Sequence, residues 1–400
     1  MQDLPPTSFA PLRIGLDYRP ALVNGEGIGR ATRELVRALV RLEDVNTIPV
    51  RLGLFGWTLA PAKFGARELG LEQGAGSRVT ARLHRLRIPS RMAKFILPKI
   101  GGANRIVGSG SSIFHHTQPA RLPVIGALQT TMLWDCIYLD EAGEPGGPWV
   151  EQSTAMGMAK SARQAARDSD LVFAPTEFVR KDLIEKLDLA PDKVVRVGLG
   201  CDHISAPDMV NRQSRQDRQS RPPFVLTVCR VDPRKNHIGM LRAFERLVAE
   251  GQSHHWIVAG PMGWRAEQFA EALENSPAKH RVHWLKTVGE AELSELYATC
   301  DVFFFGSHAE GFGLPPLEAM QLGRPVVSSN ATCLAEVLGD AFEAVEPTSS
   351  DSMFEGLRRV LSDPDRSEEL RELGPIQAAR HTWKAAAENH LAAWARLAKP

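Results

Sequence analysis

The sequence predicts an α/β protein made of two doubly wound domains, each a parallel sheet covered by helices on both faces. Its 400 residues are 43% hydrophobic, which is enough for two cores of ordinary domain size. Short apolar runs alternate with helical patterns along the C-terminal half, which is typical of a parallel sheet buried on both faces. The N-terminal half repeats this order less regularly. A polar segment at 208–223 has a linker composition and separates the halves.

The C-terminal domain, expected at 224–380, has the clearer pattern. Runs rich in Val, Ile and Phe predict strands, and the amphipathic segments between them predict helices. The predicted strands are 224–229, 255–259, 281–286, 301–305 and 325–328. The predicted helices are 237–250, 266–275, 290–299 and 315–322.

The N-terminal domain, expected at 1–207, shows the same alternation with weaker signals. Its predicted strands are 12–16, 113–114, 124–128 and 171–174, and its predicted helices are 28–42, 156–167 and 177–187. The last segment, 381–400, has apolar spacing suited to a helix. We expect this helix to pack back on the N-terminal domain, and a frayed tail is the alternative.

Charge and cysteine content exclude several classes of protein. The chain has 48 Lys and Arg against 47 Asp and Glu, so no global field attracts nucleic acid and an anion site must be local. The five cysteines are odd in number and widely spaced, which argues against a disulfide framework or a zinc site. Neither a leader pattern nor a membrane-length apolar run is present, so the sequence predicts a cytoplasmic protein.

The segment 307–325 is the most informative part of the chain. It places Glu310 and Glu318 on either side of a glycine-rich turn and a Pro-Pro pair. Proline is favoured in the first turn of a helix, so a helix should begin near position 315 with Glu318 in its first turn. An acid that merely complements the helix dipole would explain Glu318 alone. It would not explain Glu310 or the glycines of 311–314, whose backbone N–H groups can approach an anion, so we favour a binding site.

Three cations lie where the first strand of the C-terminal domain ends. Arg230, Arg234 and Lys235 fall on a loop at the carboxyl edge of the sheet, the edge to which 311–314 also belongs. A solvated basic loop is the simpler reading. We favour a diphosphate site, because a Lys/Arg pair beside oriented amides is what a diphosphate requires.

A second glycine-rich loop, 23–30, follows the first strand of the chain. Gly25, Gly27 and Gly29 do not match the G-x-G-x-x-G dinucleotide fingerprint, so a dehydrogenase is a weak reading. We expect the loop to face the cleft and to help enclose a sugar or a phosphate.

The order of these features resembles the family 4 retaining glycosyltransferases of the GT-B fold, which transfer sugars from nucleotide-sugar donors across two Rossmann-like domains. The resemblance covers nearly the whole chain and is strongest at 291–297, 307–318, 323–327 and 334–340. Among relatives it is most similar to the bacterial mannosyltransferases that build O-antigen and other surface polysaccharides. That choice rests on the sequence PRKNH and on the tryptophan in AGPMGW.

The resemblance implies a role for each site residue. Arg230 and Lys235 would bind the donor diphosphate, Glu318 the ribose, and Glu310 the transferred sugar. The implied donor-binding set is Gly27, Gly29, Arg230, Lys235, Gly311, Phe312, Gly313, Leu314 and Glu318. The implied catalytic set is Glu310, Arg230, Lys235 and Asp135. Protein cations would stabilise the leaving diphosphate, so we expect no metal or other cofactor, and the chain lacks an evident Asp-x-Asp motif.

One position departs from the family pattern. Where many relatives read Ile-His-Asp, this chain reads Leu133-Trp134-Asp135. Trp134 either stacks on a sugar face while Asp135 makes the polar contact, or belongs to the core. His115 and His116 are the nearest substitutes for the missing histidine, although a structural role is favoured for both.

A basic amphipathic stretch at 78–99 suggests contact with an anionic membrane or a lipid-diphosphate acceptor, and a solvated basic face explains it equally well. The sequence therefore predicts a retaining, metal-independent mannosyltransferase that uses GDP-mannose. Its acceptor would be a glycan, lipid-linked, at the inner face of the plasma membrane. A hexosyltransferase that uses a UDP-sugar, and a catalytically silent nucleotide-sugar-binding scaffold, are the alternatives.

Overall fold

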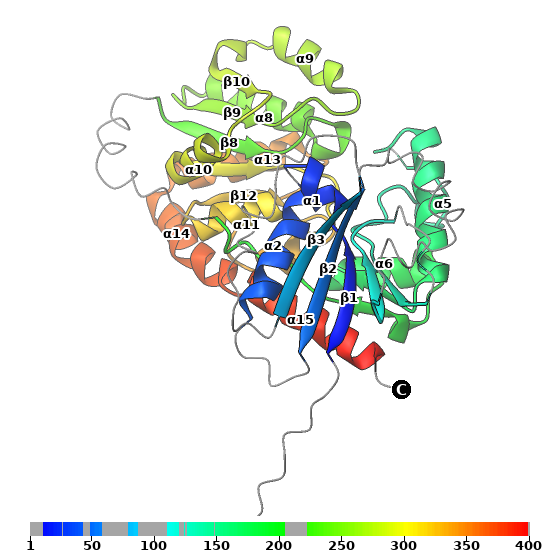
Figure 1. Cartoon of the computed structure of the whole chain (residues 1–400). Helices are drawn as coiled ribbons and strands as arrows, with labels where there is room; N and C mark the ends of the chain where they lie inside the picture. The colour runs from blue at the N-terminus through cyan, green and yellow to red at the C-terminus, as the bar shows by residue number, and fades with distance from the viewer. Residues whose placement is uncertain are drawn as a thin grey trace, which may run out of the picture.

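The computed structural model describes residues 11–25, 27–42, 49–57, 79–86, 110–119, 124, 126–147, 149–204 and 222–398. These residues form two parallel sheets, one in each half of the chain, with helices packed on their faces (Figure 1). The predicted linker at 208–223 lies outside the described residues except for its last two positions.

The N-terminal sheet has the strand order β3-β2-β1-β4-β5-β6-β7, and every pairing in it is parallel. Its strands are β1 (Leu12–Asp17), β2 (Val50–Trp57), β3 (Val79–Leu86), β4 (Ile113–His116), β5 (Leu128–Met132), β6 (Leu171–Ala174) and β7 (Val194–Arg196). The helices of this half are α1 (Arg19–Val23), α2 (Ile28–Arg41), α5 (Gln152–Asp168), α6 (Glu177–Lys186) and the 3-10 turn η2 (Pro191–Lys193).

The C-terminal sheet has the order β10-β9-β8-β11-β12-β13 and is also parallel. Its strands are β8 (Phe224–Val228), β9 (His255–Ala259), β10 (Val282–Leu285), β11 (Val302–Phe305), β12 (Val326–Ser329) and β13 (Glu343–Val345). The helices and 3-10 turns are η4 (Pro233–Lys235), α8 (His237–Ala249), α9 (Ala266–Glu274), η5 (Lys279–Arg281), α10 (Glu290–Thr299), α11 (Leu314–Gln321), α12 (Leu334–Leu338), α13 (Ser350–Ser362), α14 (Pro364–Ala378) and α15 (Trp383–Leu397).

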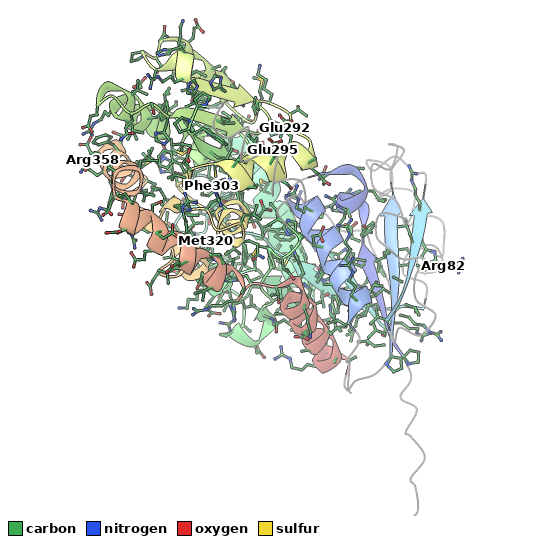
Figure 2. All side chains as sticks on the ribbon, turned by 90° about the vertical axis from the view of Figure 1, so that its left-hand side faces the viewer. Arg82, Glu292, Glu295, Phe303, Met320 and Arg358 are labelled. Carbon is green, nitrogen blue, oxygen red and sulfur yellow. The ribbon has the colours of Figure 1, made fainter. Side chains whose placement is uncertain are left out.

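The N-terminal sheet differs from its prediction in four strands. The strand expected at 124–128 lies instead at Leu128–Met132, and β2, β3 and β7 were not expected. The first part of the basic stretch at 78–99 forms β3, the edge strand of the sheet, where alternating side chains leave Arg82 exposed (Figure 2). The rest of that stretch lies outside the described residues.

Helix α15 returns from the C-terminal half to the N-terminal sheet (Figure 1). The indole nitrogen of Trp394, which is fully buried, donates to Oγ1 of Thr130 in β5 at 3.2 Å. The side-chain amide of Asn389 donates to the carbonyl of Val197 at 3.0 Å. The chain therefore crosses between its halves twice, once before β8 and once before α15.

A second link between the halves runs from α12 to α6. Glu336 in α12 accepts hydrogen bonds from the backbone nitrogens of Glu177 and Phe178, both at 2.8 Å. Thr176 caps the same helix by accepting from the nitrogen of Val179 at 3.2 Å. The first-turn N–H groups of α6 are thus satisfied partly from its own half and partly from the other half.

Candidate functional site

Glu310 and Glu318 are positioned by the loop between β11 and α11. Gly313 is the N-cap of α11 and has a φ of 89°, and a Cβ there would lie 2.5 Å from Cδ2 of Leu334. Glycine is required at this position for both reasons. The helix begins at Leu314, close to the predicted start, with Pro315 and Pro316 in its first turn. The prediction that Glu318 lies in the first turn is wrong, because the earlier start places it one turn further along the helix.

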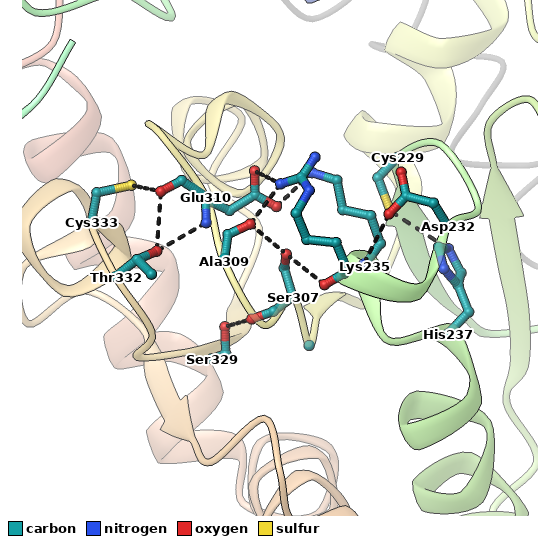
Figure 3. A network of polar contacts seen from close by, with 12 residues as sticks. Cys229, Asp232, Lys235, His237, Ser307, Ala309, Glu310, Ser329, Thr332 and Cys333 are labelled. Carbon is teal, nitrogen blue, oxygen red and sulfur yellow. Dashed lines mark hydrogen bonds and ion pairs between the residues drawn. The ribbon is translucent and has the colours of Figure 1, made fainter. Parts of the chain in front are cut away.

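Glu310 lies between two cations. Its carboxylate is 2.5 Å from Nζ of Lys235 and 3.0 Å from Nη1 of Arg234, and the residue is only 8% exposed (Figure 3). Burial would raise the pKa of Glu310, but the charges of Lys235 and Arg234 outweigh it and lower the pKa to about 2. Glu310 is therefore a buried anion at neutral pH, with its charge balanced by two fixed cations.

Thr332 fixes the backbone of Glu310. Its hydroxyl accepts from the nitrogen of Glu310 at 2.9 Å and donates to the Glu310 carbonyl at 3.1 Å (Figure 3). The φ of Thr332 is 54°, a left-handed conformation that costs a β-branched residue about 1–3 kcal/mol. Sequence reasoning missed this residue, because nothing in the local pattern at 331–333 indicates a contact 22 positions away.

The basic loop after β8 supplies Lys235 and Arg234 but not Arg230. Asp232 caps η4 by accepting from the backbone nitrogen of Lys235 at 3.3 Å. Nη1 of Arg234 also donates to the carbonyl of Ala309 at 2.6 Å, which ties this loop to the Glu310 loop. Arg230 is exposed, and the described residues show it beside Gly263 rather than in the Glu310 cluster. The diphosphate role assigned to Arg230 stays a prediction.

Glu318 is held by three side chains. Its Oε1 accepts from Nη1 of Arg30 at 3.2 Å and from Nε2 of His203 at 3.1 Å, and its Oε2 accepts from the Tyr297 hydroxyl at 2.8 Å. Burial would raise the pKa of Glu318, whereas the His203 hydrogen bond and the Arg30 charge lower it to about 2. None of the three partners was selected from the sequence.

The N-terminal glycine loop is held by Arg33. Its guanidinium donates to the carbonyls of Ala21, Asn24 and Gly25 at 3.2, 2.6 and 2.6 Å. A Cβ at Gly29 would lie 2.3 Å from the carbonyl oxygen of Asn24, so this glycine allows a close approach within the loop itself. Gly27 has a φ of 54° and faces open space. Of Gly27 and Gly29, Gly27 is therefore the one with room beside it for another group.

Trp134 and Asp135 bring the N-terminal half against the Glu310 loop. A Cβ at Gly311 would lie 2.1 Å from the carbonyl oxygen of Trp134 and 3.3 Å from Cβ of Asp135. The Trp134 indole donates to the carbonyl of Thr117 at 2.9 Å. Desolvation raises the pKa of half-buried Asp135, and the nearby charge of Arg234 opposes that rise.

The remaining predicted residues are mainly buried in the described structure. Phe312 is buried, with its ring edge against His381 at 5.7 Å, and Leu314 is half-buried. His115 and His116 are buried at the end of β4, and His115 packs against Trp394 and His390 under α15. Burial lowers the pKa of His115 well below its usual value. The structural role favoured for His115 and His116 agrees with this placement.

The described ranges show neither a cluster of three metal-ligating side chains nor a helix able to span a membrane. Within them, two buried carboxylates are each neutralised by cations or hydrogen-bond donors, and the N-terminal half contacts Glu318 directly and Glu310 through its neighbour Gly311. The N-terminus of α11 lies between these carboxylates in sequence. Such an arrangement can bind a phosphate-bearing ligand with hydroxyl groups.

Comparison with known proteins gives these features a family context. Residues 210–377 match the model of the glycosyl transferases group 1 family. The chain is 30% identical over 231 residues to O-antigen chain mannosyltransferase B of Escherichia coli, a match that covers 57% of this chain and 61% of the relative. It is 29% identical over 237 residues to the serotype-specific mannosyltransferase WbdA of Escherichia coli, covering 57% of this chain and 29% of that protein. The matches thus span less than two thirds of these relatives.

Solved structures resemble the chain over nearly its full length. A sucrose-phosphate synthase from Thermosynechococcus elongatus has a TM-score of 0.71 at 15% identity, covering 96% of this chain and 98% of that one. HepE from Anabaena, solved with UDP and glucose, has a TM-score of 0.67 at 15% identity, covering 97% and 99%. This likeness confirms the predicted GT-B fold. The chain therefore has the GT-B fold, and its residues 210–377 are similar to the glycosyl transferases group 1 family.

Proposed function

We propose that this chain is a retaining mannosyltransferase that moves mannose from GDP-mannose to a glycan acceptor in the synthesis of a cell-surface polysaccharide. The observation that carries the proposal is the buried Glu310 carboxylate, held between Lys235 and Arg234 just before the N-terminus of α11. The choice of mannose is supported by the similarity to the two Escherichia coli mannosyltransferases.

In the proposed reaction, the cations and the helix N-terminus stabilise the nucleoside diphosphate as it leaves. Lys235 is only 8% exposed, so its charge acts in surroundings that screen it weakly. Glu310 accepts hydrogen bonds from hydroxyl groups of the sugar, and Glu318 accepts from the ribose. Fixed charges of this kind lower the barrier because they need no reorganisation during the reaction.

The proposed bond changes balance without a covalent enzyme intermediate. The acceptor hydroxyl oxygen bonds to the anomeric carbon from the face on which the bond to the diphosphate oxygen breaks. The hydroxyl proton passes to that departing oxygen, so the products are the nucleoside diphosphate and a glycoside with the donor's configuration. Glu310 and Glu318 act as binding groups and not as the acid/base couple of a glycosidase.

We further propose a lipid-linked acceptor at the cytoplasmic face of a membrane. The support is the basic stretch at 78–99, of which the structure describes the β3 part with Arg82 exposed. Asp135 comes from the N-terminal half, lies next to Gly311, and is the residue we assign to the acceptor side.

Transfer assays with radiolabelled donors test the function. The purified protein is incubated with GDP-mannose, GDP-fucose, UDP-glucose and ADP-glucose, and with a mannose-terminated lipid-linked acceptor, in the presence and absence of EDTA. We expect transfer from GDP-mannose, unaffected by EDTA, and an α-linked product by NMR. If sugar is transferred only from a UDP-sugar, the donor is a UDP-sugar and not GDP-mannose. Tight nucleotide binding without transfer or hydrolysis of any donor would identify a silent scaffold and refute the enzyme.

A further inference from the structure

The carboxylate of Glu318 takes its contacts from three separate parts of the chain. Tyr297 belongs to α10, in the same half as Glu318. Arg30 belongs to α2 in the N-terminal half, and His203 follows β7 in the segment that leaves that half. With Glu318 only 3% exposed, two of its three hydrogen bonds come from outside its own domain.

The orientation of His203 is set in turn by α15. The indole nitrogen of Trp383, the first residue of α15, donates to Nδ1 of His203 at 3.1 Å. Because Nδ1 accepts this bond, the ring hydrogen lies on Nε2, which points at Oε1 of Glu318 3.1 Å away. Oδ1 of Asp202 accepts from the backbone nitrogen of Trp383 at 2.8 Å and holds the start of α15 in place.

We propose that Arg30 and His203 are positioning residues for Glu318, which they hold in the orientation that binds the ribose hydroxyls of a nucleotide. A carboxylate offers about four lone-pair directions, and three of those of Glu318 are taken, so its rotation is fixed and one direction remains for a ligand. The site for the nucleoside is then complete only when both halves contribute. This inference rests on the proposed function, which assigns the ribose to Glu318.

A double-mutant cycle on nucleotide binding tests the inference. The affinities for GDP and UDP are measured by calorimetry for the wild type, Arg30→Ala, Glu318→Ala and the double variant. We expect Arg30→Ala to weaken binding of the preferred nucleotide by about five- to tenfold in the wild type, and by less than about twofold in the Glu318→Ala background. A group that acts only through Glu318 has little left to affect once that carboxylate is removed.

Two further variants separate positioning from a general structural role. Arg30→Lys retains the charge and should recover part of the lost affinity, and His203→Phe, which keeps a ring but no donor, should resemble Arg30→Ala. Arg37→Ala is the matched control, because Arg37 lies on the same helix and pairs with Glu34 at 2.5 Å. It should leave the affinity within about twofold of wild type. Thermal unfolding of each variant identifies any that fails to fold. If Arg30→Ala does not fold, His203→Phe tests the inference, and if His203→Phe does not fold, Arg30→Ala tests it.

The outcomes distinguish this inference from the proposed function. If Glu318→Ala leaves the affinity for both nucleotides unchanged, the nucleotide site itself is misassigned. If Glu318→Ala weakens binding while Arg30→Ala and His203→Phe do not, the site stands and the positioning roles are overturned. Equal losses from Arg30→Ala in both backgrounds also overturn them, because Arg30 would then act independently of Glu318.

Discussion

A methyl group at Gly311 should separate the two halves of the protein where the reaction is proposed to occur. The Cβ of Gly311→Ala would lie 2.1 Å from the carbonyl oxygen of Trp134, and Cβ atoms do not approach other heavy atoms within 3.0 Å. The two loops must therefore separate by about 0.9 Å, the difference between these distances. Both groups in the clash belong to backbone-anchored loops, so no side-chain rotation can relieve it.

We expect this displacement to slow sugar transfer about 100-fold, because a misplacement of about 1 Å between reacting groups has that effect. Nucleotide binding should weaken by no more than about tenfold, because separating the halves can at most remove the contacts of Arg30 and His203 with Glu318, while Lys235 stays in place in the C-terminal half. Gly157→Ala is the matched control. No atom lies within 4 Å of a Cβ at that helical position, so the change should be neutral or stabilise by about 0.5–1 kcal/mol.

The assay is steady-state transfer with saturating donor, accompanied by calorimetric titration of GDP. Turnover of Gly311→Ala within about twofold of wild type would refute the reasoning, because the Trp134–Gly311 contact would then not belong to the reactive arrangement. Loss of GDP binding in parallel with turnover would equally contradict it, since the methyl group would then disturb the donor side itself.

Two other substitutions probe the buried charges. Lys235→Ala should reduce turnover by about 100- to 1,000-fold, because it removes a fixed cation beside Glu310. The control is Lys279→Ala, which breaks an ion pair with Glu274 at 2.9 Å in which both side chains are more than half exposed, and which should leave turnover unchanged. Transfer rates are measured for both variants, and a Lys235→Ala rate within about twofold of wild type would show that the diphosphate is misplaced. Burial raises the pKa of Asp17 to about 6 from 3.8, so its favourable contribution is present below 3.8 and is lost as the pH rises through about 6. Asp17→Asn should therefore stabilise the protein by up to about 3 kcal/mol at about pH 8 and by little at about pH 4, as measured by urea unfolding; an equal gain at both values would contradict this assignment.

Much of the C-terminal half could be predicted from the sequence because its signals are local. Strands such as Val302–Phe305 are continuous apolar runs buried on both faces, and the helix after them has two prolines in its first turn. The spacing of Glu310 and Glu318 around that start is visible in the sequence alone. The N-terminal sheet was harder, because β2 contains Gly53 and Gly56, and the edge strand β3 mixes apolar residues with Thr80, Arg82, His84 and Arg85.

The partners of the two carboxylates could not be predicted for a different reason. Arg30 reaches Glu318 across 288 positions of sequence, and His203 reaches it across 115. Such contacts depend on how the halves are placed and not on any local pattern. The pairing of Arg234 with Glu310 could not be predicted for the same reason, since Arg234 lies on one loop with Arg230 and only the fold of that loop directs it inward.

The cap that Glu336 places on α6 makes the stability of one helix depend on the position of another domain. When the halves separate, the amides of Glu177 and Phe178 lose their acceptors, and the first turn of α6 keeps the hydrogen bonds that the nitrogens of Val179 and Arg180 donate to Thr176. Domain opening is then accompanied by fraying of this helix end, whose N-cap Thr176 also donates to the carbonyl of Gly311, next to Glu310, at 3.2 Å. Hydrogen exchange at the amides of Glu177 and Phe178 would follow the opening equilibrium, so its rate would report how often the two halves separate.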